Sequence, residues 1–314
     1  MSSESVVLPS GRIKGIALVL IGSILWGTSG TVAQFLFQQQ GFSAEWLVVI
    51  RLLMAGALLL AFAYQKEGKR VWEIWRKKEA RFQIALFGLF GMLAVQYTYF
   101  AAIQHGNAAT ATVLQYLGPV IITCYLALVS KRLPNRKEVI AVILAVVGTF
   151  FLVTGGSIQS LSISGWAVFW GISSAFALAF YTLQPHKLLT EWGSKIVVGW
   201  GMLIGGIGFS FIHPPWKFEG EWSLSSYAAV IFVVVFGTLI AFYCYLESLR
   251  YISATETSLL ACAEPLSAAF LSVMWLHVSF GFAEWIGTFC ILSTIVILSV
   301  VKDAKVSKKP KRPL

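Results

Sequence analysis

The chain has 314 residues, of which 57% are hydrophobic and 12% charged, and its formal net charge at pH 7 is +10. Soluble domains carry about 25% charged residues, so this composition argues against a soluble enzyme and against a disordered protein. The basic residues stand in short clusters between apolar runs, which is typical of loops beside a membrane and not of a nucleic-acid-binding surface. We therefore expect a polytopic membrane protein that binds no nucleic acid.

Ten apolar segments follow one another along the chain, separated by charge clusters and by Gly, Pro, Asn and Ser turns. Each approaches the ~20 residues that a helix needs to cross a bilayer. They are residues 13–37, 44–64, 82–103, 107–129, 136–154, 163–185, 195–212, 224–248, 254–276 and 283–301. The first is too long for a signal peptide and has no small-residue cleavage site. The sequence thus predicts an all-α membrane protein with ten transmembrane helices.

The placement of lysine and arginine predicts the orientation of these helices. With the N-terminus inside, 22 of the 24 basic residues fall in cytoplasmic segments, and the outer loops hold only Lys217. The positive-inside rule then predicts that both termini are cytoplasmic and that the number of spans is even.

The two halves of the chain resemble each other at low identity. An offset of 146 residues aligns Tyr99 with Tyr245, Pro119 with Pro265 and Glu138 with Glu284, and an offset of 144 aligns Trp26-Gly27 with Trp170-Gly171. Chance matches among apolar helices remain the alternative to an internal duplication.

A duplicated unit with five spans must be inverted in its second copy, which is a common plan among secondary transporters. We divide the chain into a cytoplasmic tail (1–12), a first repeat (13–154), a second repeat (155–301) and a basic cytoplasmic tail (302–314). The paired prolines fall near the bilayer centre and free backbone carbonyls there. The candidate hinge residues are Gly27, Pro119, Gly171 and Pro265.

These features together resemble the EamA family of the drug/metabolite transporter superfamily. The resemblance rests on the paired Trp-Gly, on Arg51 within Val-Ile-Arg-Leu-Leu, and on Ala-Glu-Pro-Leu at 263–266. The first half departs from the pattern, because it has Gly118-Pro119 where the second has Glu264-Pro265. The resemblance implies a multi-pass plasma-membrane carrier that exports a small metabolite, such as an amino acid, an amine, a carboxylate or a drug-like compound.

Two charged residues fall inside predicted spans. A charge near the bilayer centre costs ~2.5–3.5 kcal/mol on insertion scales, so such residues face the protein interior and find a partner. Glu264 is a candidate for binding a cation or a proton, and its alternative is a structural, neutral carboxyl. Arg51 is a candidate partner of Glu264 or an anchor for a substrate carboxylate, and its alternative is a snorkelling side chain.

Polar and aromatic residues at helical spacing complete the candidate substrate site. Such groups line a wet cavity in some spans and only hold helices together in others. They are Trp26, Gln34, Gln96, Tyr99, Gln115, Tyr116, Trp170 and Tyr181.

We therefore expect a secondary transporter that works by alternating access, with protons as a candidate coupling ion and with the lipid bilayer and a small molecule as its partners. No nucleophile, phosphate-loop or metal-ligand motif is present, so we expect no enzyme, cofactor or metal. A passive channel and, less well supported, a membrane-embedded enzyme are the alternatives.

Overall fold

The computed structural model describes residues 9–307, except residues 132, 134, 157–162, 249–250, 253–256, 258–259 and 262. Within these residues the chain forms helices joined by short turns and contains no strand. The prediction of an all-α protein is confirmed. Residues 1–8 and 308–314 of the predicted tails lie outside the described part.

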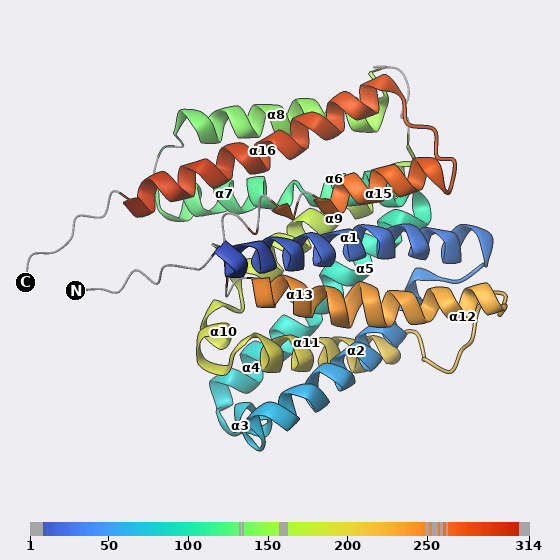
Figure 1. Cartoon of the computed structure of the whole chain (residues 1–314), viewed down its shortest axis with the longest axis vertical. Coiled ribbons are helices and arrows are strands. Elements are labelled where there is room, and N and C mark those ends of the chain that lie inside the picture. Colours follow the sequence, from blue (N-terminus) through green and yellow to red (C-terminus); the bar gives the residue numbers. More distant parts are fainter. Residues whose placement is uncertain are drawn as a thin grey trace, which may run out of the picture.

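The helices run back and forth as one bundle (Figure 1). The first half contains α1 (Pro9–Gln39), α2 (Ala44–Glu67), α3 (Arg70–Glu73), η1 (Ile74–Arg76), α4 (Lys78–Leu86), η2 (Phe87–Leu93), α5 (Ala94–His105), α6 (Ala108–Gln115), α7 (Gly118–Val129) and α8 (Arg136–Thr154). The second half contains α9 (Gly165–Leu183), α10 (His186–Trp192), α11 (Ser194–Ser210), α12 (Leu224–Ile231), η3 (Phe232–Ile240), α13 (Ala241–Ser248), α15 (Ala263–Met274) and α16 (Phe282–Ser307).

Each of the ten predicted segments coincides with helix in the described residues, the ninth from Ala263 onward. In the part of the chain that the structure describes, seven helical stretches are long and apolar enough to cross a bilayer. Three further apolar helices are shorter: Ser194–Ser210, Ala263–Met274 and Phe282–Thr294.

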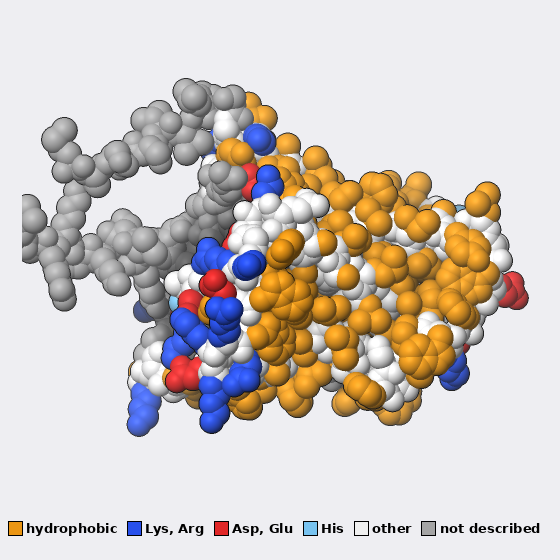
Figure 2. Space-filling model, turned by 90° about the horizontal axis from the view of Figure 1, so that it is seen from below, with side chains coloured by type: hydrophobic (Ala, Val, Ile, Leu, Met, Phe, Trp, Pro, Cys, Tyr) orange, Lys and Arg blue, Asp and Glu red, His pale blue; other side chains and the backbone are white. Residues whose placement is uncertain are grey.

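The surface of the bundle is strongly apolar. Large hydrophobic side chains such as Leu128, Phe211 and Phe289 are 77%, 87% and 76% exposed. Figure 2 shows hydrophobic side chains as a broad orange area on one face, with most Lys and Arg side chains of this face gathered at one end. An exposed apolar surface of this extent is unfavourable in water and favourable in lipid. The chain is therefore a multi-pass membrane protein.

Helix starts follow from local capping. The side chain of Ser43 accepts a hydrogen bond from the backbone N–H of Trp46 at the start of α2. Asn135 and Glu138 form a capping box at the start of α8, each side chain bonding the other residue's backbone N–H at 2.9 Å. These caps satisfy N–H groups that a helix leaves unpaired.

Glycines let the central helices pack closely. A Cβ on Gly56 of α2 would lie 2.8 Å from the backbone nitrogen of Leu203 in α11. At the edge of the bundle, a Cβ on Gly148 of α8 would lie 2.8 Å from the carbonyl oxygen of Gly287 in α16. Small residues at helix contacts are the usual means of close packing in membranes.

Two of the long helices contain a π-helical segment, η2 and η3. In η3 the hydroxyl of Thr238 donates to the carbonyl of Val233, five residues earlier, at 2.9 Å. A third helix is interrupted between α6 and α7 at Tyr116 and Leu117. Such breaks redirect carbonyls and side chains toward the interior, and they often occur at functional sites.

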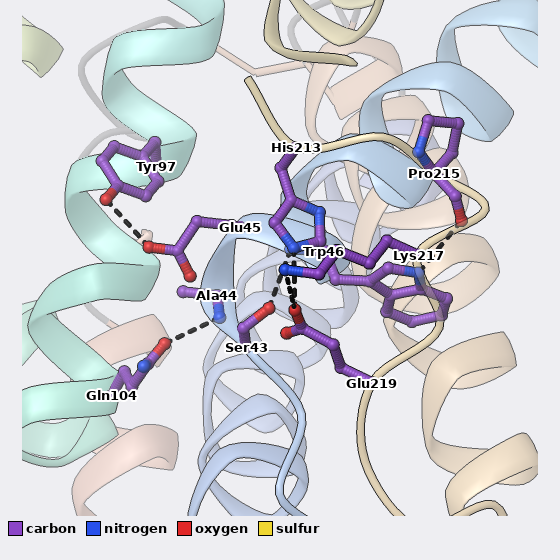
Figure 3. Close-up of polar contacts among 10 residues, drawn as sticks. All are labelled: Ser43, Ala44, Glu45, Trp46, Tyr97, Gln104, His213, Pro215, Lys217 and Glu219. Carbon is purple, nitrogen blue, oxygen red and sulfur yellow. Dashed lines mark hydrogen bonds and ion pairs between the residues drawn. The ribbon is translucent and has the colours of Figure 1, made fainter. Parts of the chain in front are cut away.

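We call the end of the bundle at which α1 begins and α16 ends the terminal end (Figure 1). At the opposite end, the loop between α11 and α12 lies against the start of α2 (Figure 3). The indole N–H of Trp46 donates to the carbonyl of Pro215 at 3.1 Å, and Glu219 contacts His213 Nε2 at 3.0 Å and Lys217 Nζ at 3.4 Å. Hydrogen bonds to Glu219, first from the Ser43 hydroxyl and then from His213 and Lys217, lower the pKa of its carboxyl.

Candidate functional site

Glu264 lies in the first turn of α15, inside the bundle. The hydroxyl of Tyr116 is 3.1 Å from its Oε2 and 2.9 Å from the carbonyl of Ala261, and it can donate to either oxygen. The positive end of a helix dipole stabilises a carboxylate in this position. Tyr116 itself ends α6 at the interruption before α7. The carboxyl therefore lies where a helix start from one half meets a helix break from the other.

Arg51 of α2 is buried, with 5% of its surface exposed. Its Nε donates to Thr238 Oγ1 at 2.6 Å, and its Nη2 donates to the carbonyl of Gly237 at 3.4 Å. Its guanidinium carbon also lies 4.9 Å from the ring centre of Phe100. No ion pair within 4 Å joins this described side chain to Glu264, but the two charges are close enough to attract each other. In this structure Arg51 and Glu264 therefore attract each other without a direct ion pair, and both predicted roles of Arg51 remain predictions.

Two further tyrosines lie near enough to Glu264 to interact with its charge. Tyr99 and Tyr245 both interact electrostatically with its carboxyl. The hydroxyl of Tyr99 is 2.7 Å from Thr112 Oγ1, and the ring of Tyr245 packs against Trp26 with centroids 5.1 Å apart. Together these residues form a site that we call the central cluster: Arg51, Tyr99, Thr112, Tyr116, Thr238, Tyr245 and Glu264.

Glycines of α1 allow this cluster to close. A Cβ on Gly27 would clash with Ser267 Oγ and with the carbonyl oxygen of Glu264. A Cβ on Gly30 would lie 2.6 Å from the hydroxyl of Tyr99. Gly27, predicted as a hinge residue, therefore allows α1 to contact the backbone beside the carboxyl.

Other predicted site residues lie outside the central cluster. Gln34 accepts from the backbone N–H of Ala108 at 2.9 Å and so supports the start of α6. Gln96 contacts the sulfur of Met92 at 4.0 Å within its own helix. Gln115 is partly buried on α6.

The remaining predicted aromatics belong to two separate ring contacts. Trp170 packs on Tyr97 with centroids 5.3 Å apart, and Tyr181 stacks on Phe87 at 5.4 Å.

The other predicted hinge residues lie at helix contacts and helix starts. Gly171 of α9 lies against Leu114 of α6, and a Cβ on this glycine would lie 3.0 Å from the Cβ of Leu114. Pro119 and Pro265 stand in the first turns of α7 and α15.

Sequence reasoning missed Thr238 and Gly237 because a π-helical segment does not follow the 3.6-residue period. Tyr245 carried a usable signal, since it aligns with Tyr99 at the offset of 146. Among the described residues, no group of three or more His, Cys, Asp or Glu is placed to hold a metal ion. The described groups offer one carboxyl, one guanidinium and several hydroxyls, which suits binding of small polar or charged solutes.

A carboxyl and a guanidinium held inside an apolar helix bundle are typical of membrane transport proteins. The EamA-like transporter family matches this chain at residues 13–154 and 165–300. The chain belongs to the EamA-like transporter family, which confirms the resemblance seen in the sequence.

Similar proteins carry transporter names. The inner membrane transporter YicL of Salmonella typhimurium is 41% identical over 91% of this chain and 95% of its own length. The inner membrane transporter YedA of Escherichia coli K12 is 24% identical over 89% and 88%. A solved crystal structure with 17% identity has a TM-score of 0.60 and covers 96% of this chain and 99% of its own, which shows a shared fold.

Proposed function

We propose that this chain is a secondary transporter that exports a small metabolite by alternating access between two inverted five-span repeats. Family membership supports transport itself. The observation that carries the proposal is the position of Glu264, partly buried at a helix start and contacted by Tyr116 from the other half. Transporter folds of this kind bind substrate where interrupted helices of two repeats meet.

Matching helix breaks support ten spans in two repeats. The π-helical segments η2 and η3 begin 145 residues apart and end 147 apart. Helices α7 and α15, each with a proline in the first turn, begin 145 residues apart. These separations agree with the offset of 146 found in the sequence, and they support the proposed repeats at 13–154 and 155–301.

The distribution of basic side chains supports a cytoplasmic terminal end. Figure 2 shows most Lys and Arg of the visible face at this end, beyond the apolar area. The positive-inside rule assigns such an end to the cytoplasm.

In the proposed cycle Glu264 exchanges partners. In the described state the Tyr116 hydroxyl contacts its carboxyl, and Arg51 attracts it across a gap. A proton or the ammonium group of a substrate would replace these contacts on one side of the membrane and leave on the other. Amines and amino acids fit this exchange directly, and carboxylates fit it through Arg51.

The test is transport by Glu264→Gln protein in proteoliposomes, with Glu264→Asp as the matched control that keeps the charge. We expect Glu264→Gln to fold and insert but to lose substrate counterflow, or to lose its dependence on pH between about 5.5 and 8.5. Flux equal to wild type at every pH would make Glu264 structural and overturn the proposal. Flux without saturation or counterflow would instead indicate a channel.

A further inference from the structure

A pocket of about 260 Å³ opens at the terminal end, away from the central cluster. Residues of α2, α11 and α13 line it, and the ring of Phe62 in α2 packs against the ring of Tyr243 in α13, with centroids 6.3 Å apart. Its walls include the apolar side chains of Leu59 and Phe62. The pocket therefore lies where a bilayer changes from acyl chains to headgroups.

Charges of both signs line this pocket. Lys195, the second residue of α11, contributes its ammonium group, which lies 5.1 Å from the ring centre of Phe62. Glu67 at the end of α2 and Glu247 near the end of α13 contribute carboxylates. Glu67 also pairs with Arg70 at 3.5 Å. One ammonium group and two carboxylates in one small pocket match a ligand that carries an anion and a cation side by side.

The tyrosine aligned with Tyr243 in the first half contacts other side chains. Tyr97 precedes Tyr243 by 146 residues, and its hydroxyl donates to Glu45 Oε1 at 3.0 Å. Its ring packs on Phe209 with centroids 5.0 Å apart. Tyr243, in contrast, lines the pocket and is 45% exposed. Of these two aligned tyrosines, Tyr243 therefore borders the pocket and Tyr97 does not.

We propose that this pocket binds the headgroup of a phospholipid that carries an ammonium group, such as phosphatidylethanolamine. The phosphate lies at Lys195, the ammonium lies between Glu67 and Glu247, and the acyl chains stay in the surrounding bilayer. Its volume is below the ~300–1,000 Å³ of most small-molecule sites, which suits a headgroup whose tails stay in the bilayer. A soluble zwitterion has the same charges, but it has no acyl chains that could contact the adjacent apolar helix surfaces.

Native mass spectrometry of the purified protein tests this assignment with three probes: dioleoylphosphatidylethanolamine, dioleoylphosphatidylglycerol and soluble glycerophosphoethanolamine. We expect retention of the first and weaker binding of the other two. Lys195→Gln should weaken phosphatidylethanolamine binding about two- to fivefold, the range of one partly exposed ion pair. Lys137→Gln, an exposed change at the same end on α8, is the matched control and should bind like wild type.

The carboxylates are tested by the double variant Glu67→Gln/Glu247→Gln. It should lose the preference for phosphatidylethanolamine over phosphatidylglycerol, while the exposed control Glu79→Gln keeps it. Equal binding of both lipids by wild type, or unchanged preference in the double variant, would overturn the assignment. If glycerophosphoethanolamine bound as tightly as phosphatidylethanolamine, the assignment of a lipid ligand would be wrong, and the pocket would instead bind a soluble zwitterion. None of these measurements depends on transport at Glu264.

Discussion

A buried arginine needs acceptors, and here neutral groups supply them. Arg51 donates to Thr238 Oγ1 and to the carbonyl of Gly237, both in η3. These bonds join α2 of the first half to the π-helical segment of the second. They hold the guanidinium in the position from which it attracts the carboxyl of Glu264. We therefore expect Arg51 to act first as a positioning residue.

Thr238→Val keeps the size of the side chain but removes this acceptor. Leaving a buried charged donor without its partner costs about 1–3 kcal/mol or more. We expect a lower midpoint of thermal unfolding in detergent. Thr182→Val is the control, because that exposed hydroxyl bonds only the carbonyl of Leu178 in its own helix. An equal effect of both substitutions would mean that the bond to Arg51 contributes nothing.

Gly27→Ala tests the close contact between α1 and α15. The new methyl group would clash with the carbonyl of Glu264 and with Ser267, so the helices must separate. Overpacking of this kind costs about 1–3 kcal/mol. We expect reduced stability and reduced substrate flux. Gly165→Ala is the matched control, since nothing lies within 4 Å of its added Cβ, and it should behave like wild type.

At the scale of elements, the apolar runs and their caps are readable in the sequence. Ser43 and Asn135 precede the segments that they cap, and the predicted segments coincide with described helix. The internal geometry of those helices is not readable in the same way. Whether a helix takes a π turn depends on its neighbours, and η3 is held by Arg51 from 187 residues away. Pattern analysis could therefore place Glu264 and Tyr116 on helices but could not find Thr238.

The loop between α11 and α12 should depend on pH through Glu219. Its carboxyl has a lowered pKa because it accepts hydrogen bonds from Ser43, His213 and Lys217. The folded carboxyl thus holds protons less tightly than the unfolded one, whose ordinary pKa is 4.5. The resulting stabilisation is present above that value and is lost as pH falls through the lower, folded pKa.

Hydrogen exchange of residues 213–222 measures this effect. We expect protection to be constant from about pH 5.5 upward, after correction for intrinsic exchange rates, and to fall below about pH 4. Glu219→Gln should show weak protection at every pH, and Glu221→Gln, at an exposed neighbour, should follow wild type. A pH profile shared by all three proteins would show that Glu219 does not hold the loop.

At the scale of the whole molecule, the two proposed repeats share a plan but not their residues. Both have a proline at the start of α7 or α15, but only the second has a glutamate before it. The carboxyl is therefore supplied once, and the first half contributes Tyr116 to it. If the two halves rock against each other, a substrate can reach this carboxyl from either side of the membrane in turn. One acidic group then serves both access states, and a second one in the first half is not needed.

The distribution of Lys and Arg along the chain predicts the orientation of the whole molecule in the membrane. The opposite orientation would put outside the segments predicted from the sequence to be cytoplasmic, which hold 22 basic residues, against the positive-inside rule. In a variant without native cysteines, Glu221→Cys should react with an impermeant maleimide added to intact cells. Lys69→Cys, equally exposed but at the terminal end, should react only after the membrane is permeabilised. Labelling of Lys69→Cys in intact cells would reverse the orientation, and it would also place the headgroup pocket in the outer leaflet.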